Sequence, residues 1–420
     1  MDINLMTNQE KLIFIRTFLK ARQKDLARND ITREFISMVE SGKRNMSRDV
    51  AIDIMRNAIE FAKEKEIELN YDEEFIARNN EEDLCVLCES LPNNEESFEK
   101  CDYISALGKE KNMQWPEVYA TKKKGNIYVV NQEYDKAERV YRKCLNLIDR
   151  IGSNALKQEI YNNLGLIKDR CLQYYDAVVY YQEALNYCYI NNEFTIKDKI
   201  NYNIGLTYYN MEDYEKSLDT LQRLLYDEVE KSSYYYKSKM IQGVIFYKLK
   251  KTPEALETLS NLIQVENIDN ESLIRAYNNI ALCYIDKEEY SKAEKFFDKA
   301  IEIADKVKLT KHEILGDKGN LYFEVKRYDE AIGVLKESVE ISEEIGNYKY
   351  QLEGLKLLYK IYFEEKDESE QEKILIRILS VANDTGSKDE IIWSMKRLID
   401  LAVKQKDLNK VKIFNDYIKD

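Results

Sequence analysis

One pattern repeats along most of this 420-residue chain and constrains its fold more than any other feature. Residues 277–304 read as two amphipathic helices joined by a short polar turn, with small and aromatic residues on the faces that would meet. The small residue of the first helix recurs every 38 or 40 residues, at Gly125, Gly165, Gly205, Gly243, Ala281 and Gly319. A single hairpin of this kind cannot bury its own apolar face, so the copies must stack on one another.

Other positions of the repeat keep the same spacing. Most copies carry an aromatic residue three positions after the small one, as at Tyr128 and Tyr284, and most second helices contain an alanine such as Ala137 or Ala293. This order resembles the tetratricopeptide repeat, and the resemblance implies a right-handed α-solenoid of helical hairpins. The interval is longer than the ~34 residues usual for that repeat, which predicts longer helices or turns.

Residues 8–68 differ from the repeats in pattern and in charge. Residues 11–56 contain 11 Lys or Arg against 6 Asp or Glu, although the whole chain has a net charge of −13. The string Gln23-x-x-Leu26-Ala27, followed by Ile36-Ser37-x-Val39-Glu40-x-Gly42-Lys43-Arg44, resembles the helix-turn-helix of phage-repressor and Xre-type regulators. A charged, solvated helix in a small bundle is the alternative interpretation.

The helix-turn-helix resemblance implies a set of DNA contacts. Residues at the start of the second helix would reach base edges in the major groove, and the others would hold phosphates. The expected base contacts are Thr32, Arg33, Glu34 and Ser37, and the expected phosphate contacts are Gln23, Lys43, Arg44 and Arg48. The fold class is therefore predicted to be all-α, with a helix-turn-helix domain followed by the solenoid.

We expect three segments: a DNA-binding domain over residues 1–68, a helical connector with a degenerate capping repeat over 69–116, and the repeat domain over 117–420. Cys85 and Cys88 in the connector form a C-x-x-C match that favours core thiols, with a metal or redox pair as the alternative. A structural zinc site needs about four ligands, and the only histidine, His312, is far away in the sequence. We expect no cofactor, no metal and no enzymatic activity.

By resemblance to peptide-binding tetratricopeptide domains, the groove positions lie six and two residues before the small residue and one after it. Asparagine is a poor helix former, yet it recurs at two of these positions, at Asn126, Asn163, Asn203, Asn279 and Asn320. Such amides could bind a peptide backbone, or they could join one helix to the next. The third position carries Lys199, Lys237 and Arg275, which could select a carboxylate or form ordinary ion pairs within the repeats.

This domain order is similar to that of the Rap–Rgg–NprR–PlcR–PrgX group of peptide-sensing regulators from Gram-positive bacteria. The resemblance implies a cytoplasmic, homodimeric transcription factor that binds an operator in double-stranded DNA and is controlled by a short signalling peptide. No apolar run approaches the ~20 residues that a membrane span needs, so we expect no membrane partner. In the alternative, the repeat domain is a scaffold that binds and sequesters a response regulator, as in Rap-type proteins.

Overall fold

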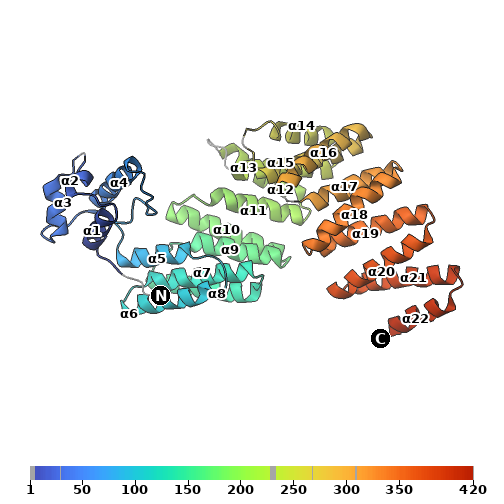
Figure 1. Ribbon diagram of the computed structural model, residues 1–420, viewed down its shortest axis with the longest axis horizontal. Coiled ribbons are helices and arrows are strands. Elements are labelled where there is room, and N and C mark those ends of the chain that lie inside the picture. Colours follow the sequence, from blue (N-terminus) through green and yellow to red (C-terminus); the bar gives the residue numbers. More distant parts are fainter. Residues whose placement is uncertain (1–4, 29, 228–232, 267, 308–309, 420) are drawn as a thin grey trace. The chain divides into compact units, whose positions relative to one another are not determined.

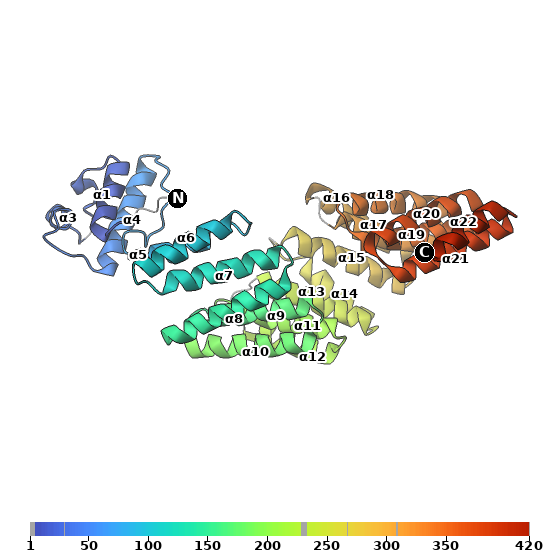
Figure 2. The ribbon, with the colours of Figure 1, turned by 90° about the horizontal axis from the view of Figure 1, so that it is seen from below.

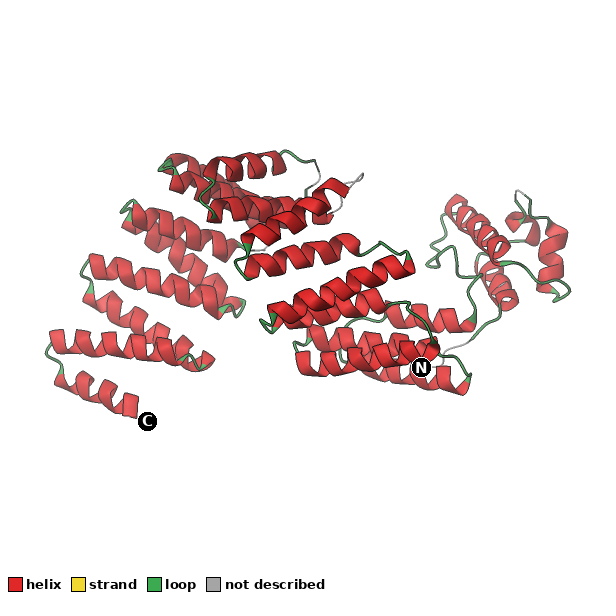
Figure 3. Ribbon diagram, turned by 180° about the vertical axis from the view of Figure 1, so that it is seen from behind, coloured by secondary structure: helices red, strands yellow, loops and turns green. Residues whose placement is uncertain are grey.

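The protein is described by a computed structural model that covers residues 5–28, 30–227, 233–266, 268–307 and 310–419. All regular secondary structure in these residues is helical, as Figure 3 shows by its red helices and green loops. The predicted all-α fold class is confirmed.

Most helices follow one another with short connections, and the longest connection within the first unit joins α4 to α5 over residues 65–79 (Figure 1). The first four form the N-terminal bundle: α1 (Asn8–Phe18), α2 (Gln23–Leu26), α3 (Arg33–Glu40) and α4 (Arg48–Glu64). The connector contains α5 (Asn80–Ser90) and α6 (Ser97–Glu110). The next six helices are α7 (Trp115–Val130), α8 (Tyr134–Ile151), α9 (Lys157–Arg170), α10 (Tyr174–Asn191), α11 (Lys197–Asn210) and α12 (Tyr214–Asp227). The remaining helices are α13 (Ser233–Lys248), α14 (Thr252–Leu262), α15 (Asn270–Asp286), α16 (Tyr290–Val307), α17 (Lys311–Glu324), α18 (Tyr328–Glu344), α19 (Tyr348–Glu364), α20 (Glu368–Thr385), α21 (Lys388–Lys404) and α22 (Leu408–Lys419).

Side-chain caps and one glycine set the helix ends of the N-terminal bundle. The Thr32 hydroxyl accepts a hydrogen bond from the Phe35 amide at 3.1 Å and fixes the start of α3. Gly42 has a φ of +72°, a conformation that only glycine adopts without strain, and it lets the chain turn away after α3. Apolar side chains from α1, α3 and α4, among them Ile15, Ile36 and Ile54, form one buried core.

In four of the repeat hairpins, the small residue of the first helix lies directly against a large side chain of the second. A Cβ atom placed on Gly125 would come within 2.5 Å of the Tyr141 ring. The same approach occurs between Gly165 and Tyr181, where the distance would be 2.6 Å. This close packing confirms the expected pairing of small and large residues, because the absence of a side chain at Gly125 and Gly165 leaves room for the tyrosine rings.

The chain forms two compact units, residues 1–207 and 208–420, which divide within α11. The boundaries that we expected after residues 68 and 116 stay predictions. In the first unit, α7 to α10 form two successive hairpins that pack on each other, as Figures 1 and 2 show. None of the described helices is both long and apolar enough to cross a membrane.

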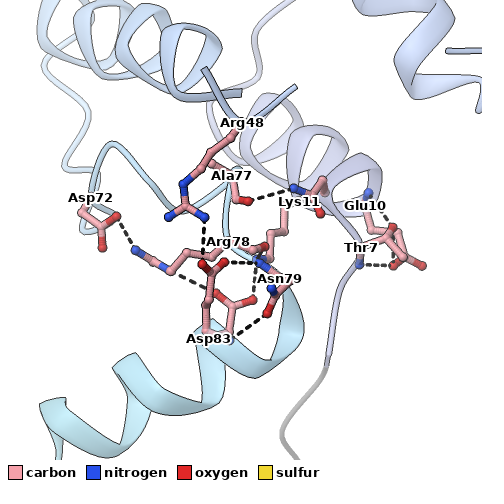
Figure 4. A network of polar contacts seen from close by, with 11 residues as sticks. Thr7, Glu10, Lys11, Arg48, Asp72, Ala77, Arg78, Asn79 and Asp83 are labelled. Carbon is pink, nitrogen blue, oxygen red and sulfur yellow. Dashed lines mark hydrogen bonds and ion pairs between the residues drawn. The ribbon is translucent and has the colours of Figure 1, made fainter. Parts of the chain in front are cut away.

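A buried ionic network attaches the N-terminal bundle to α5 (Figure 4). Lys11 of α1 is 1% exposed, pairs with Asp83 of α5, and donates to the Arg78 carbonyl at 2.7 Å. Arg78 in turn pairs with Asp72 at 2.6 Å and with Asp83 at 3.2 Å. Because buried charges are stable only when they are paired, this network fixes where α1 meets α5.

Candidate functional site

A cavity of about 370 Å³ in the first unit lies over the first helices of three successive hairpins. Its wall includes Asn126 of α7, Asn163 of α9 and Lys199 of α11, all of them predicted groove residues. We call this cavity the amide pocket. Three residues that are widely spaced in the sequence meet here because each occupies the inner side of a stacked helix.

Two asparagines and a tyrosine form a hydrogen-bonded group in the amide pocket. The Tyr141 hydroxyl donates to Asn126 Oδ1 at 2.6 Å. Asn163 Nδ2 lies 3.2 Å from the Tyr141 hydroxyl and 3.4 Å from Asn126 Oδ1. The helix-to-helix alternative is thus realised, but it uses only part of each amide. Among the described residues nothing bonds to Asn126 Nδ2 or to Asn163 Oδ1, which leaves one donor and one acceptor at the pocket.

Asn203 of α11 extends this arrangement. Its Nδ2 donates to Asn162 Oδ1 of α9 at 3.0 Å. Asn162 is 2% exposed and belongs to the wall of the amide pocket. Asn203 therefore acts on the pocket through a neighbouring amide and is placed to orient it.

Lys199 determines the charge of the amide pocket. No ion pair joins its ammonium group to any residue that the structure describes. The one carboxylate of the wall, Glu159, is already paired with Lys122 at 2.7 Å. Burial lowers the pKa of Lys122, but the carboxylates of Glu159 and Glu89 outweigh it and hold the pKa above its usual value. Lys199 is thus left as a cation beside free amide groups, an arrangement that suits a carboxylate.

The predicted groove cations of the second unit are engaged differently. Arg275 pairs with Glu271 at 3.2 Å and with Glu313 at 3.7 Å, which is the intra-repeat alternative. The ammonium of Lys237 lies 5.4 Å from the centre of the Tyr234 ring.

The two predicted asparagines of the second unit bond within their own helices. Asn279 Nδ2 donates to the Arg275 carbonyl at 2.7 Å, and Asn320 Nδ2 donates to the Gly316 carbonyl at 3.3 Å. Asn320 also lines a separate cavity of about 280 Å³ that contains the carboxylates of Glu313, Asp317 and Glu353. Burial raises the pKa of Asp317, which accepts a hydrogen bond from Asn278 at 2.8 Å. Glu313 and Asp317 lie six and two residues before Gly319, at groove positions of the repeat, and Lys356 and Lys360 also line this cavity.

The expected DNA-binding residues lie on the outer side of α3 and in the turns around it. Thr32, Arg33, Glu34, Lys43 and Arg44 are exposed, and Ser37 is partly exposed. Gln23 instead donates to Glu40 at 2.7 Å, and Glu40 also pairs with Arg16 of α1. The structure thus presents the start of α3 to solvent and uses Gln23 to connect α2 with α3.

Arg48, the last expected phosphate contact, joins the N-terminal bundle to the connector. Its guanidinium pairs with Glu74 and with Glu82 of α5, both at 2.8 Å, at the edge of the buried network in Figure 4. These three side chains are about half exposed. Arg48 can therefore exchange its carboxylates for another anion without leaving a charge buried.

The cysteines of the connector lie inside it. Cys85, Cys88 and Cys101 are buried, and burial raises the pKa of the Cys85 thiol to about 12. Within the part of the chain that the structure describes, no three His, Cys, Asp or Glu side chains are grouped as metal ligands would be. The arrangement is that of core thiols.

Sequence reasoning missed Tyr141 and Asn162 as parts of the amide pocket. A signal for Tyr141 was present, because the same repeat position carries Tyr181, Leu221, Leu259, Phe297 and Leu335. Asn162 gave no comparable signal, since its place in the wall depends on how successive helices stack. Glu159 lies six residues before Gly165, at the same groove position as Lys199.

Comparison with known proteins agrees with this fold. Models of the tetratricopeptide repeat family match residues 274–306, 198–226 and 312–345. A search of curated proteins found no match.

Solved structures with a similar fold include the apo form of the quorum sensor NprR from B. thuringiensis. It is 14% identical with a TM-score of 0.57, and the match covers 88% of this chain and 99% of that one. A Rap protein complexed with competence and sporulation factor is 14% identical with a TM-score of 0.49, covering 77% and 98% of the two chains. A tetratricopeptide repeat protein from Parabacteroides merdae is 17% identical with a TM-score of 0.48, covering 68% and 98%.

Proposed function

We propose that this protein is a peptide-controlled transcriptional regulator, in which the amide pocket binds a short peptide and the N-terminal bundle binds operator DNA. One observation carries the proposal: Asn126, Asn163 and Lys199 come from the first helices of three successive hairpins and meet in one pocket with hydrogen-bonding capacity to spare. Free amide groups can bind a peptide backbone, and Lys199 can pair with a peptide carboxylate.

The DNA-binding part of the proposal rests on α3. Its exposed first turn carries Arg33, and the following turn carries Lys43, in a segment with an excess of positive charge. A recognition helix needs this arrangement, with side chains free to reach bases and basic groups beside them for phosphates. We propose that the protein acts as a homodimer in the cytoplasm, because two-fold dimers read two half-sites.

A chain of contacts could connect the two sites. Glu159 in the pocket wall pairs with Lys122, and Lys122 also pairs with Glu89 of α5. At its other end, α5 carries Glu82, which pairs with Arg48 of the N-terminal bundle. A ligand that attracts Glu159 or displaces Lys122 would act on α5, and through α5 on the bundle. This is our proposal for how a peptide controls DNA binding.

Calorimetry tests the peptide site. The probes are short synthetic peptides selected for binding to the wild-type protein, each made with a free and with an amidated C-terminus. Lys199→Glu should weaken binding of the free-acid forms at least tenfold and reduce the difference between the two forms. Lys295→Glu makes the same charge change at an exposed position of α16 outside the pocket, and it should bind as the wild type does. Equal binding by both variants would remove Lys199 from the site.

Capture of genomic DNA fragments tests the regulator against the scaffold alternative. The wild-type protein should retain specific fragments, and the selected peptides should change how much is retained. If it retains none with or without peptide, but instead captures a response regulator, the scaffold interpretation replaces ours.

A further inference from the structure

A second cavity of the first unit, of about 770 Å³, lies where the N-terminal bundle and the connector meet the repeats. Its wall includes side chains from the start of α4, from α5, from α7 and from the start of α9. Arg48 and Arg78, which Figure 4 shows in the network beside α5, belong to this wall. Among the residues that line it, only Glu159 also borders the amide pocket. We call it the junction cavity, and its volume lies within the ~300–1,000 Å³ typical of small-molecule sites.

The junction cavity has more carboxylates than its own cations neutralise. Its three cations, Arg48, Arg78 and Lys122, are each shared between two carboxylates. No ion pair joins Glu81 or Glu193 to any residue that the structure describes. The carboxylates of the wall are Glu74, Glu81, Glu82, Glu89, Glu159 and Glu193. The cavity therefore has a negative charge that a cation from solution can neutralise.

Neutral groups hold the two carboxylates that have no cation partner. Glu81 accepts hydrogen bonds from the backbone amides of Gln114 and Trp115, at 2.7 and 2.8 Å, at the start of α7. Glu193 accepts a hydrogen bond from Gln158 Nε2 at 2.7 Å. These bonds fix where the carboxylates lie but do not cancel their charges. Each carboxylate also has lone pairs left over, because an ionised carboxyl group accepts about four hydrogen bonds.

Two aromatic rings form an apolar side of the junction cavity. Trp115 and Tyr119 lie one turn apart on α7, with ring centres 6.3 Å apart in an edge-to-face arrangement. The chain's own ammonium group shows what such a ring can hold, since Lys122 Nζ lies 5.2 Å from the centre of the Tyr119 ring while it pairs with carboxylates. Val86 of α5, 42% exposed, adds aliphatic surface. Aromatic faces attract cations, and the aliphatic surface favours a cation with an apolar body.

One buried polar group of the wall also lacks a partner. Cys85 of α5 is 7% exposed and lines the cavity, and its thiol makes no hydrogen bond to any residue that the structure describes. Buried polar groups normally have a partner. Sulfur is a weak acceptor, so an N–H group of a ligand in the cavity can supply one.

The carboxylates are spread around the wall and do not converge on one point. Nowhere in the described ranges do three His, Cys, Asp or Glu side chains form a group that could hold a metal ion. A bare metal ion needs such a group, because several oxygen atoms bind it at once. An extended organic cation does not, since its charges are separated along a chain. The arrangement thus favours an organic cation with more than one charge.

We propose that the junction cavity binds an aliphatic polyamine, a small molecule with two or more ammonium groups joined by methylene chains. Its ammonium groups pair with carboxylates of the wall such as Glu81 and Glu193, through charge-assisted hydrogen bonds that are stronger than neutral ones. Its methylene groups lie against Trp115, Tyr119 and Val86. The inference goes beyond the proposed function, because it uses neither the amide pocket nor DNA.

Calorimetry with spermidine on the full-length protein tests the site, at about 0.15 M salt to screen weak attraction to the acidic surface. Val86→Lys places an ammonium group of the chain in the cavity, so it should weaken spermidine binding at least tenfold. Val179→Lys is the matched control, because it makes the same change at another exposed helical valine, in α10 and outside the cavity, and it should bind as the wild type does. Butylamine, which has one ammonium group, should bind the wild type at least tenfold more weakly than spermidine.

A second pair of variants tests the carboxylates. Glu81→Gln with Glu193→Gln removes two charges but keeps a hydrogen-bond acceptor at each place, and it should also weaken spermidine binding at least tenfold. Glu99→Gln with Glu183→Gln removes two charges at exposed positions of α6 and α10 outside the cavity, and it should leave the affinity unchanged. Melting temperatures show whether each variant is folded, and if Val86→Lys is not, the glutamine pair decides the question.

Three results would overturn the proposal. The first is a wild type that does not bind spermidine at millimolar concentration. The second is full affinity in the folded Val86→Lys variant or in the variant of Glu81 and Glu193. The third is a control that loses as much affinity as its matched variant, since this would show attraction to the acidic chain as a whole.

Discussion

Lys199 and Arg275 occupy the same repeat position but have different surroundings. Lys199 borders the amide pocket without an ion pair among the described residues, whereas Arg275 lies between Glu271 and Glu313. An exposed ion pair contributes little to stability, about 1 kcal/mol or less, but it does occupy the cation. Only the unpaired residue can offer its full charge to a ligand, so residue type alone does not identify the binding cation.

The contact between Gly125 and Tyr141 leads to a prediction about stability. Gly125→Ala would force the Tyr141 ring away from α7, and overpacking of this kind costs roughly 1–3 kcal/mol. Gly333→Ala is the matched control, because a Cβ there meets nothing within 4 Å. Alanine is favoured over glycine within a helix by roughly 0.5–1 kcal/mol, so the control should be slightly stabilised. Thermal unfolding of both variants checks this, and equal melting temperatures would contradict the packing argument.

His312 gives a prediction about pH. Burial lowers the pKa of this side chain, and Asn347 Nδ2 lies 3.2 Å from its Nε2, where a neutral ring accepts the hydrogen bond. The unfolded chain has the ordinary pKa of about 6.5, so it binds the proton more readily than the folded chain. The free energy of unfolding should therefore be highest above this pH and fall as the pH drops through it.

Urea unfolding at about pH 7.5 and about pH 5.5, on either side of the histidine's ordinary pKa, measures this dependence. Because His312 is the only histidine, His312→Gln should remove most of the change between these two values. An undiminished change in the variant would assign the effect to other groups.

At the scale of the elements, α3 is short, and the side chains at the start of its first turn are exposed to solvent. We predict that Arg33→Ala loses discrimination of roughly 1–3 kcal/mol at one base pair of each half-site. Lys43→Ala should weaken binding to all sequences alike and lower the slope of log affinity against log salt by about 1. Titration of captured and random DNA at several salt concentrations separates the two effects. If both variants matched the wild type on both DNAs, α3 would not be the recognition helix.

At the scale of the whole molecule, a basic N-terminal bundle belongs to an otherwise acidic chain. The connector places Glu74 and Glu82 on Arg48, so the protein's own carboxylates compete with DNA phosphate for that side chain. Control of DNA binding then needs no large change within the bundle. It needs only a change in how α5 presents its carboxylates.

This competition predicts tighter DNA binding when the carboxylates are neutralised. Glu74→Gln with Glu82→Gln should raise affinity by roughly fivefold, since exposed pairs contribute about 1 kcal/mol or less. Glutamine at position 82 keeps the helix cap that Asn79 and Glu82 form at the start of α5.

The matched control is Asp53→Asn with Glu73→Gln, which removes the same two charges from Arg56, a residue without an expected DNA contact. The first variant could also gain DNA affinity when Arg48 is replaced by alanine, or the control could gain as much. Either result would show a general charge effect instead of competition for Arg48.

The sequence by itself determined the elements and their stacking. The interval between small residues fixed the hairpins, and Gly125 and Gly319 marked where two helices approach most closely, since each meets a large side chain of the next helix. Thr32 likewise sets the start of α3 by a cap within its own turn. These features are local or strictly periodic, so each can be inferred from the residues nearby.

Only the tertiary structure decided which repeat positions remain available for binding. Asn163 points to Asn126, 37 residues away, while Asn279 bonds to its own helix four residues back. Lys199 stays unpaired beside a Glu159 that Lys122 has already neutralised from another helix. The physical reason is that the availability of a polar group depends on its hydrogen-bond and charge partners. Those partners come from different helices, whose side chains do not repeat with the period of the backbone.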